Sequence, residues 1–235
     1  MKNPTDSKEI LNYVSGFQTK AQGIRRFEGN PYVKGDNIAE HLSRLMRLLI
    51  CIAPQLKAEF PGEQDLVEKV LVTLHVHDDD EVIDGFDIPT ALKVHNEKDG
   101  KEIVDFEQSV FALGDVVRDY LVPLFRSFRK KDTLVAKIAK ALDNIAGNQL
   151  VIEQEIGLVN PDQARFAIEY AEKVRGTSKV VDLLIDAQIQ QIVEYRKIAL
   201  NNLKDLPANA EKLLQIDVLN HVLDKAKINL PLEQL

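Results

Sequence analysis

Residues 67–81 of the chain are Val-Glu-Lys-Val-Leu-Val-Thr-Leu-His-Val-His-Asp-Asp-Asp-Glu, an apolar segment that ends in an acidic run. The large apolar residues recur every three or four positions: Val67, Val70, Leu71 and Leu74. This spacing predicts an amphipathic helix that runs into an acidic turn at His77-Asp78. Imidazole and carboxylate groups suit a divalent transition ion, and neither is stable on an apolar face without a partner. The pair alone identifies no site, so its meaning depends on which other side chains can meet it.

Helical periodicity continues along most of the sequence, and no segment alternates with the two-residue period of a strand. We therefore predict an all-α fold in one domain, residues 1–235. Helices are expected at residues 6–20, 37–53, 63–77, 99–116, 117–128, 133–157, 162–175, 177–203 and 208–226. Pro54 is expected to stop the second helix, because proline removes a helical hydrogen bond and clashes with the preceding turn. Residues 78–90 are expected to form a loop or short turns.

The composition describes a globular protein, since 45% of the 235 residues are hydrophobic and 29% are charged. The N-terminus lacks the apolar core of a signal peptide and no apolar run is long enough to cross a bilayer, so we expect a cytoplasmic protein without a membrane partner. The single cysteine, Cys51, excludes an internal disulfide and is expected in the core. A net charge of −7 argues against a nucleic-acid duplex as partner. The one basic cluster, Arg126–Lys131, is interpreted as a solvated helix end, with a phosphate site as the alternative.

Two other predicted helices offer residues that can join the histidine–aspartate pair, namely His41 and Asp143. Asp143 would lie on a helix face of small and apolar residues, where an unpaired carboxylate is unstable. With both residues included, two histidines and two carboxylates could hold one ion and leave coordination positions open for water and substrate. Asp182 and Asp186 remain alternatives for the last carboxylate, although their helix neighbours are more polar.

Three segments together resemble the HD-domain metal-dependent phosphohydrolases, in particular their 5′-deoxynucleotidase branch. They are Arg26-Phe-Glu-Gly-Asn-Pro-Tyr-Val-Lys-Gly-Asp-Asn-Ile-Ala-Glu-His41, His77-Asp-Asp-Asp-Glu-Val-Ile-Asp-Gly-Phe-Asp-Ile-Pro-Thr-Ala-Leu-Lys93 and Ala139-Lys-Ala-Leu-Asp-Asn-Ile145. The branch has an arginine and an aromatic residue fifteen and fourteen positions before a motif histidine, and Arg26 and Phe27 stand at those distances from His41. The resemblance covers about residues 20–155, so residues 160–235 are expected to be a C-terminal helical addition.

The resemblance implies a role for each matching residue. The implied metal ligands are His41, His77, Asp78 and Asp143. Glu81 would shuttle a proton or orient water, and Asp87 would act on the nucleophilic water or the leaving group. The implied substrate-binding residues are Arg26 on the phosphate, Phe27 against the sugar and Lys93 as a second cation. The cofactor would be one divalent ion, with Mn, Co, Zn, Fe and Mg all compatible, and the family pattern favours a homodimer.

Three positions depart from the pattern of that branch. Phe86 is inserted between Gly85 and Asp87, Phe27 replaces a tryptophan, and Ala91 stands where a second proline is common. These departures bear on the position of Asp87 and on the substrate, while the metal ligands are intact. The expected function is hydrolysis of the phosphomonoester of (deoxy)nucleoside 5′-monophosphates. Two alternatives stay open: an HD phosphohydrolase acting on nucleoside triphosphates or phosphodiesters, and a non-enzymatic helical protein that keeps a metal.

Overall fold

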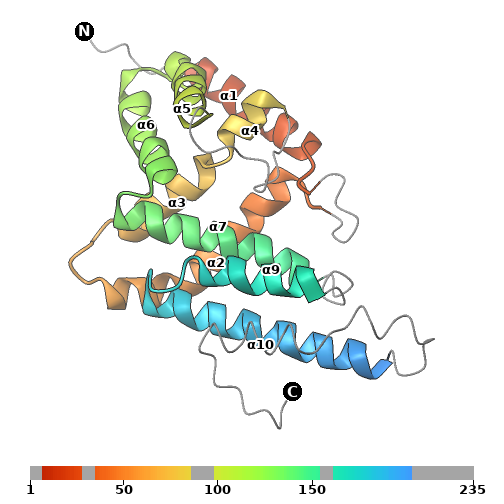
Figure 1. The fold of residues 1–235 in the computed structure, drawn as a ribbon. Helices are drawn as coiled ribbons and strands as arrows, with labels where there is room; N and C mark the ends of the chain where they lie inside the picture. The colour runs from red at the N-terminus through yellow and green to blue at the C-terminus, as the bar shows by residue number, and fades with distance from the viewer. Residues whose placement is uncertain (1–6, 28–34, 86–97, 154–160, 203–235) are drawn as a thin grey trace. The chain divides into compact units, whose positions relative to one another are not determined.

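A computed structural model describes residues 7–27, 35–85, 98–153 and 161–202 (Figure 1). All regular elements in these residues are helices, and the only extended pairing among them is a single bridge between Arg25 and Asn37. The prediction of an all-α fold is therefore confirmed. No helix in the described part of the chain is long and apolar enough to span a membrane. The predicted helix at 208–226 lies outside the described residues.

Contacts within the chain divide it into two compact units. Among the described residues, the first unit extends to Asp143 and the second begins at Asn144. The division falls inside helix α7 (Leu134–Glu153), so that helix contributes residues to both units. The prediction of a single domain stays a prediction.

The first unit contains most of the helices. They are α1 (Ser7–Gly23), α2 (Ile38–Glu59), α3 (Leu66–Val76), α4 (Asp79–Asp84), α5 (Lys98–Ser109), a short 3-10 helix η2 (Phe111–Leu113) and α6 (Asp115–Lys130). Helix α2 packs against α1 and α3, and α3 also packs against α6. Helix α5 packs against α4 and α6. The end of α3 and the start of α4, where His77 and Asp78 lie, are therefore supported by neighbours on several sides.

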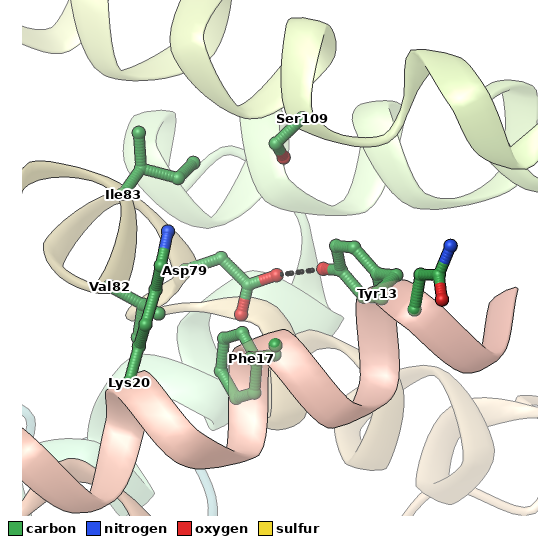
Figure 2. A pocket seen from close by; sticks show the side chains of 9 residues that line it. Tyr13, Phe17, Lys20, Asp79, Val82, Ile83 and Ser109 are labelled. Atoms are coloured by element: carbon green, nitrogen blue, oxygen red, sulfur yellow. Dashed lines mark hydrogen bonds between the residues drawn. The ribbon is translucent and has the colours of Figure 1, made fainter. Parts of the chain in front are cut away.

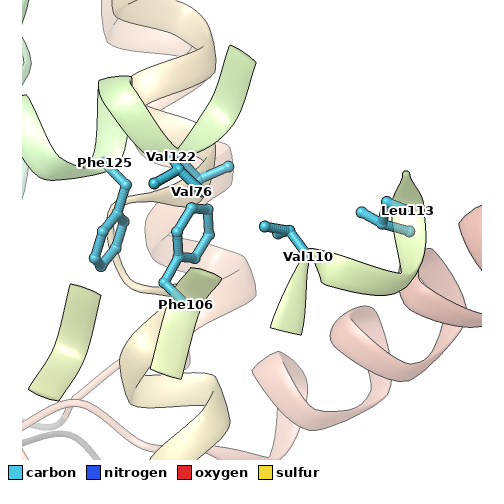
Figure 3. Packing of buried hydrophobic residues seen from close by; sticks show 6 residues of the cluster. All are labelled: Val76, Phe106, Val110, Leu113, Val122 and Phe125. Carbon is cyan, nitrogen blue, oxygen red and sulfur yellow. The ribbon is translucent and has the colours of Figure 1, made fainter. Parts of the chain in front are cut away.

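A buried apolar cluster fixes the C-terminal end of α3 (Figure 3). Its members come from α3, α5, η2 and α6 and the residue before η2: Val76, Phe106, Val110, Leu113, Val122 and Phe125. The rings of Phe106 and Phe125 stack with their centroids 4.2 Å apart. Full burial of one such side chain contributes about 1.5–3 kcal/mol. Val76 directly precedes His77, so this packing holds the backbone from which the histidine extends.

Helix α2 continues through Pro54 to Glu59, so the predicted stop at this proline is wrong. A proline inside a helix costs about 3 kcal/mol. The apolar face of α2 extends across the proline, with Ile52 and Leu56 both buried. Burial of two such side chains offsets the cost, at about 1.5–3 kcal/mol each. The expectation that Cys51 lies in the core is also wrong, because its side chain is exposed.

Two glycines set helix ends that the apolar pattern did not locate. The predicted helix at 99–116 ends at Ser109, and α6 begins only after Gly114, whose φ of 88° favours glycine. Gly85 ends α4 with a φ of 83°, and its N–H donates to the carbonyl of Glu81 at 2.8 Å. Residues 79–84, expected as loop or short turns, are thus a short helix. Because these residues are helical, the acidic side chains of α4 extend from the backbone in different, fixed directions.

The second unit contains the last ten residues of α7 together with α9 (Pro161–Glu172) and α10 (Lys179–Asn202). Helices α9 and α10 pack against each other. Buried amide side chains join α7 to α10: Asn148 Nδ2 donates to Gln188 Oε1 at 3.1 Å, and Gln188 Nε2 donates to the carbonyl of Ile145 at 2.8 Å. Gln188 Nε2 also donates to Gln149 Oε1 at 3.1 Å. This network of amide side chains carries no charge.

Candidate metal centre

Four side chains converge where α2, α3, α4 and α7 meet in the first unit. They are His41 on α2, His77 at the end of α3, Asp78 at the start of α4 and Asp143 on α7, and all four are buried. Asp143 Oδ1 lies 3.1 Å from His41 Nε2 and 3.4 Å from His77 Nε2. Asp78 Oδ1 lies 3.1 Å from His77 Nε2, and Asp78 Oδ2 lies 3.9 Å from His41 Nε2. The structure therefore brings together the four residues that the sequence proposed as a ligand set.

The ring of His77 has a defined orientation. Its Nδ1–H donates to the carbonyl of Leu74 at 2.7 Å, so Nε2 is the nitrogen that faces the carboxylates. Phe128 packs edge-on against this ring with the centroids 5.3 Å apart. A backbone carbonyl that holds the second ring nitrogen of a histidine is typical of metal sites, because it selects the tautomer and the ring angle.

His41 is placed by the N-terminus of α2. The side chain of Asn37 accepts a hydrogen bond from the backbone N–H of Glu40 at 2.9 Å, and the Glu40 carboxylate accepts one from the backbone N–H of Asn37 at 3.1 Å. This capping box fixes the first turn of the helix that carries His41. The buried neighbours Ile38 and Leu45 hold the same face of α2 in the core. His41 thus reaches Asp143 from a helix whose start is rigidly set.

The two histidines have opposite charge preferences. Burial lowers the pKa of His41 to about 4, and the nearby Arg26 guanidinium contributes to that shift. Burial also disfavours the charged form of His77, but Asp78 and Asp143 outweigh it and raise its pKa to about 10. Both aspartates stay ionised: burial would raise their pKa values, yet His77 for Asp78 and Lys140 for Asp143 hold them below the usual range. Protonated His77, together with Lys140 and Arg26, therefore offsets the charge of the two buried carboxylates, and a divalent cation at the same place would take over the role of the His77 proton.

The donor set fits a divalent metal ion. His41, His77 and Asp143 each offer one ligand atom, and these atoms lie within 4.8 Å of one another. Two buried polar atoms at the centre, His77 Nε2 and Asp78 Oδ2, form ion-pair contacts at 3.1 and 3.9 Å but no hydrogen bond of good geometry among the described residues. Leaving such atoms buried without a good hydrogen bond is costly, and coordination of a cation would relieve that cost. Two imidazoles with two carboxylates suit Mn, Fe, Co and Zn.

The four consecutive acidic residues 78–81 contact or act on several different groups. Asp78 faces the histidines, whereas Tyr13 Oη donates to Asp79 Oδ2 at 2.5 Å on another side of α4. Asp80 forms an ion pair with Arg129. Glu81 is buried, and its charge acts on Arg26 and Arg129. Four consecutive carboxylates can be buried together because a histidine, a tyrosine and two arginines lie around them, with Arg129 acting on both Asp80 and Glu81.

Arg129 is a supporting residue that the sequence interpretation missed. Its guanidinium Nε lies 3.4 Å from Glu102 Oε2, and its Nη2 donates to the backbone carbonyl of His77 at 3.5 Å. The interpretation of residues 126–131 as a solvated helix end is therefore wrong for this arginine, whose side chain is only 13% exposed. Its partners come from α4, from α5 and from the backbone of His77, contacts that no local spacing on α6 reveals.

Lys140 is a second residue that the sequence analysis did not single out. Its Nζ donates to Asp143 Oδ2 at 2.7 Å from one turn earlier on α7. The signal was present, since residues three apart on a helix share a face. The Oδ1 atom of Asp143 thus faces the two histidines, and its Oδ2 atom faces Lys140.

Arg26 lies close to the ligand cluster. Burial would lower its pKa, but the negative charges of Asp78, Asp143, Glu81 and Asp36 outweigh that effect and raise it. The Nε and Nη1 atoms of Arg26 are buried, and neither has a hydrogen-bond partner among the described residues. The guanidinium lies 5.7 Å from the centroid of the Phe27 ring. Two unpaired N–H groups beside a metal centre would suit an anionic ligand.

Close backbone contacts hold Arg26 and Phe27 near the start of α2. The backbone N–H of Arg26 donates to the carbonyl of Asp36 at 2.8 Å. A Cβ atom on Gly35 would lie 1.5 Å from the carbonyl oxygen of Arg26, so only glycine fits there. Phe27 adopts a φ of 58°, a left-handed conformation that costs a non-glycine residue about 1 kcal/mol or more. The chain accepts this strain at the residue proposed to face the substrate.

The remaining candidate site residues lie either in other contacts or outside the described residues. Asp182 accepts a hydrogen bond from the backbone N–H of Gly176 at 2.7 Å, and Asp186 lies 2.8 Å from Arg175 Nη2. Both rivals of Asp143 are therefore engaged in other contacts. Asp87 and Lys93, together with Phe86 and Ala91, lie outside the described residues.

A pocket of about 190 Å³ lies between α1, α4 and the end of α5 (Figure 2). Tyr13, Phe17 and Lys20 line it from α1, and Asp79 and Val82 line it from α4. None of the four proposed ligands lines it. Burial raises the pKa of Asp79 to about 8, so this carboxyl is largely protonated at neutral pH. Asp79 therefore lines this pocket, although the next residue in the chain, Asp78, belongs to the proposed ligand set.

The geometry agrees with a comparison to known protein families. The family model described as HD domain matches residues 20–183 of the chain. The chain belongs to the HD-domain family. Searches of curated proteins and of solved structures returned no match. HD-domain membership implies a metal-dependent phosphohydrolase, and the buried group of His41, His77 and Asp143 could bind the metal of such an enzyme.

Proposed function

We propose that this HD-domain protein hydrolyses the phosphomonoester of (deoxy)nucleoside 5′-monophosphates. The observation that carries the proposal is the position of Arg26, whose buried and unpaired N–H groups lie within the electrostatic reach of Asp78 and Asp143. A phosphate bound at a metal on these carboxylates would meet a guanidinium, which matches phosphate oxygens with two parallel N–H donors. The matching branch of the family, suggested by the sequence segments, places an arginine in this role.

In this proposal His41, His77, Asp78 and Asp143 hold one divalent ion. When bound, the ion would supply Lewis-acid polarisation of the phosphoryl group and activation of water. The residues themselves contribute rigidity, because the Leu74 carbonyl holds His77 and Lys140 holds Asp143. Phosphoryl transfer depends mainly on positioning and electrostatic stabilisation, so fixed ligands and fixed cations are the features to expect.

Glu81 is proposed to accept the proton of the attacking water or to orient that water. It is buried one helical turn from Asp78 on α4, in the field of two arginines, Arg26 and Arg129. Arg26 would donate to the phosphoryl oxygens as negative charge spreads over them. Phe27, whose ring lies beside the Arg26 guanidinium, would pack against the sugar. Asp87 is proposed to act on the leaving 5′-oxygen and Lys93 to serve as a further cation.

A phosphate-release assay on mono-, di- and triphosphates of the common nucleosides, with Mn²⁺, Co²⁺ or Mg²⁺, tests this function. Selective release of phosphate from monophosphates would support it. Turnover of triphosphates or phosphodiesters alone would favour the second candidate, for which the insertion of Phe86 next to Asp87 is the specific sequence observation. No turnover of any substrate by metal-loaded protein would contradict both, and would leave a non-enzymatic metal-containing protein. The cytoplasm remains the proposed compartment.

A further inference from the structure

We infer that Lys140 is the second cation that binds the substrate phosphate at the metal centre, a role that rests on the proposed function and makes it more specific. The two carboxylate oxygens of Asp143 face different groups. Its Oδ1 faces both histidines, while its Oδ2 lies 2.7 Å from Lys140 Nζ. The ammonium is therefore one carboxylate away from the ion that this cluster would hold, which is the distance range of a phosphate bound to that ion.

The ammonium of Lys140 is held in place from a second side. Its Nζ lies 5.5 Å from the centroid of the Phe128 ring, and that same ring packs edge-on against His77. A cation above an aromatic face gains about 0.5–2 kcal/mol, depending on its solvation. The lysine is thus positioned by a carboxylate and a ring that both contact the ligand histidine, before any substrate arrives.

Exposure distinguishes Lys140 from the two carboxylates of the cluster and from Arg129. Its side chain is 29% exposed, whereas those of Asp143 and Asp78 are 9% and 11% exposed and Arg129 is 13% exposed. Lys140 therefore lies where the buried cluster meets solvent, the side from which an anion can approach. Lysine carries a compact charge on a flexible stem, so its ammonium can follow an entering anion while staying near Asp143.

The local charge requires such a cation. Asp78, Asp143 and Glu81 are buried close together, and a divalent ion with one arginine leaves little net positive charge for a dianion. A like-charged field of this kind repels a phosphate unless a further cation stands at its entrance. The Nε and Nη1 atoms of Arg26 are buried, and Lys140 adds a second cation whose side chain is 29% exposed.

The test uses inorganic phosphate as the probe and full-length protein loaded with Mn²⁺. Phosphate affinity is measured by calorimetry, and Mn²⁺ affinity by the electron paramagnetic resonance signal of the free ion. Lys140→Met and Lys140→Gln should each weaken phosphate binding roughly tenfold or more, the loss expected for one charge-assisted contact. Both variants should bind Mn²⁺ as tightly as the parent or more tightly, because a positive charge beside Asp143 has been removed. Lys140→Arg should keep most of the phosphate affinity.

Lys137→Met is the matched control. Lys137 is also a lysine, lies about one turn before Lys140 on the same helix and is exposed. It should leave both affinities unchanged. Unchanged phosphate affinity in Lys140→Met and Lys140→Gln would overturn the inference. So would a tenfold or larger loss of Mn²⁺ affinity, because the lysine would then serve only to hold Asp143. Neither measurement needs turnover, so a protein that binds phosphate through Lys140 yet releases none from nucleotides would contradict the proposed function alone.

Discussion

The molecule buries two polar clusters, and they satisfy their buried polar groups in different ways. In the second unit, Asn148, Gln149 and Gln188 exchange hydrogen bonds between neutral amides, and none of their buried side-chain atoms lacks a partner. In the first unit, the cluster around His77 is charged, and His77 Nε2 and Asp78 Oδ2 have no hydrogen-bond partner among the described residues. Both clusters join helices that are distant in sequence.

The difference indicates what each cluster is for. A satisfied neutral network stabilises and specifies packing without any ligand. A buried charged cluster whose ion pairs leave some atoms without a hydrogen bond is costly by itself, and a bound cation would lower that cost. We therefore expect substitutions in the first cluster to act on metal binding and turnover, and substitutions in the second to act on stability.

The largest effect is expected from Asp78→Ala. Loss of this carboxylate removes a proposed ligand, so Mn²⁺ affinity should fall by more than the ~100-fold typical of groups that only support a ligand, and turnover should vanish with it. Elemental analysis after dialysis and a phosphate-release assay check both results. The control is Asp84→Ala on the same helix, whose carboxylate lies 3.4 Å from Lys101 Nζ and which should keep its metal. A metal-replete, inactive Asp78→Ala would remove Asp78 from the ligand set.

Glu81→Gln should separate metal binding from catalysis. The substitution keeps the shape of the side chain but removes a proton acceptor, so kcat should fall by roughly 10²–10⁴-fold. Mn²⁺ affinity should change little, because Glu81 is not among the four proposed ligands. Equal metal loss in Glu81→Gln and Asp78→Ala, measured on parallel samples, would place Glu81 in the ligand set.

Arg26→Ala should lower kcat/KM on a nucleoside monophosphate by roughly 10²-fold, since it removes charge-assisted hydrogen bonds to the phosphate. The neighbour Arg25 provides the control. Its side chain is exposed and its Nη1 donates to the carbonyl of Gly35 at 3.3 Å. Arg25→Ala should behave like the parent protein. Parent-like turnover in both variants would mean that the phosphate binds elsewhere.

Gln188→Leu tests the neutral cluster. The change leaves the amide of Asn148 without its acceptor, so the free energy of unfolding should fall by about 1–3 kcal/mol in a urea titration. Metal affinity and kcat should not change. Gln190→Leu is the control on the same helix, because Gln190 is exposed and its Nε2 donates to the nearby Glu194. A drop in metal affinity in Gln188→Leu with normal stability would remove the contrast between the two clusters.

A further prediction is a pH dependence confined to the charged cluster. The pKa of His77 is raised from 6.5 to about 10 in the folded protein, so its stabilising contribution is full below pH 6.5 and is lost as pH rises toward 10. Metal-free protein should therefore lose urea resistance between pH 6.5 and 10. A bound metal removes this proton from His77, so the slope should be shallower with Mn²⁺. An equal slope in metal-free His77→Gln would assign it to other groups.

The sequence suggested the proposed ligand residues because some of them are unusual in their own surroundings. Asp143 stands among Ala136, Ala139 and Ala146, all buried in the structure, which is why a carboxylate there indicated a cation. The start of α2 at Asn37 was likewise visible, since its capping residues are adjacent in the chain. Local patterns of this kind contain the information that the fold uses.

Other features depend on contacts that no local pattern contains. The pairing of Arg129 with Asp80 joins α6 to α4, so the spacing within either helix does not predict it. Pro54 suggested a helix end, and only the burial of Ile52 and Leu56 explains why α2 continues. The hydrogen bond between Tyr13 and Asp79 joins α1 to α4, and its two residues are more than sixty positions apart in the sequence.

Anomalous diffraction from crystals of the Mn²⁺-loaded protein tests the central claim most directly, because it locates the ion and its ligands in one measurement. The account predicts a single ion about 2.0–2.3 Å from His41 Nε2, His77 Nε2 and one oxygen each of Asp78 and Asp143. An ion bound elsewhere, or one bound with Asp182 or Asp186 in the place of Asp143, would contradict it.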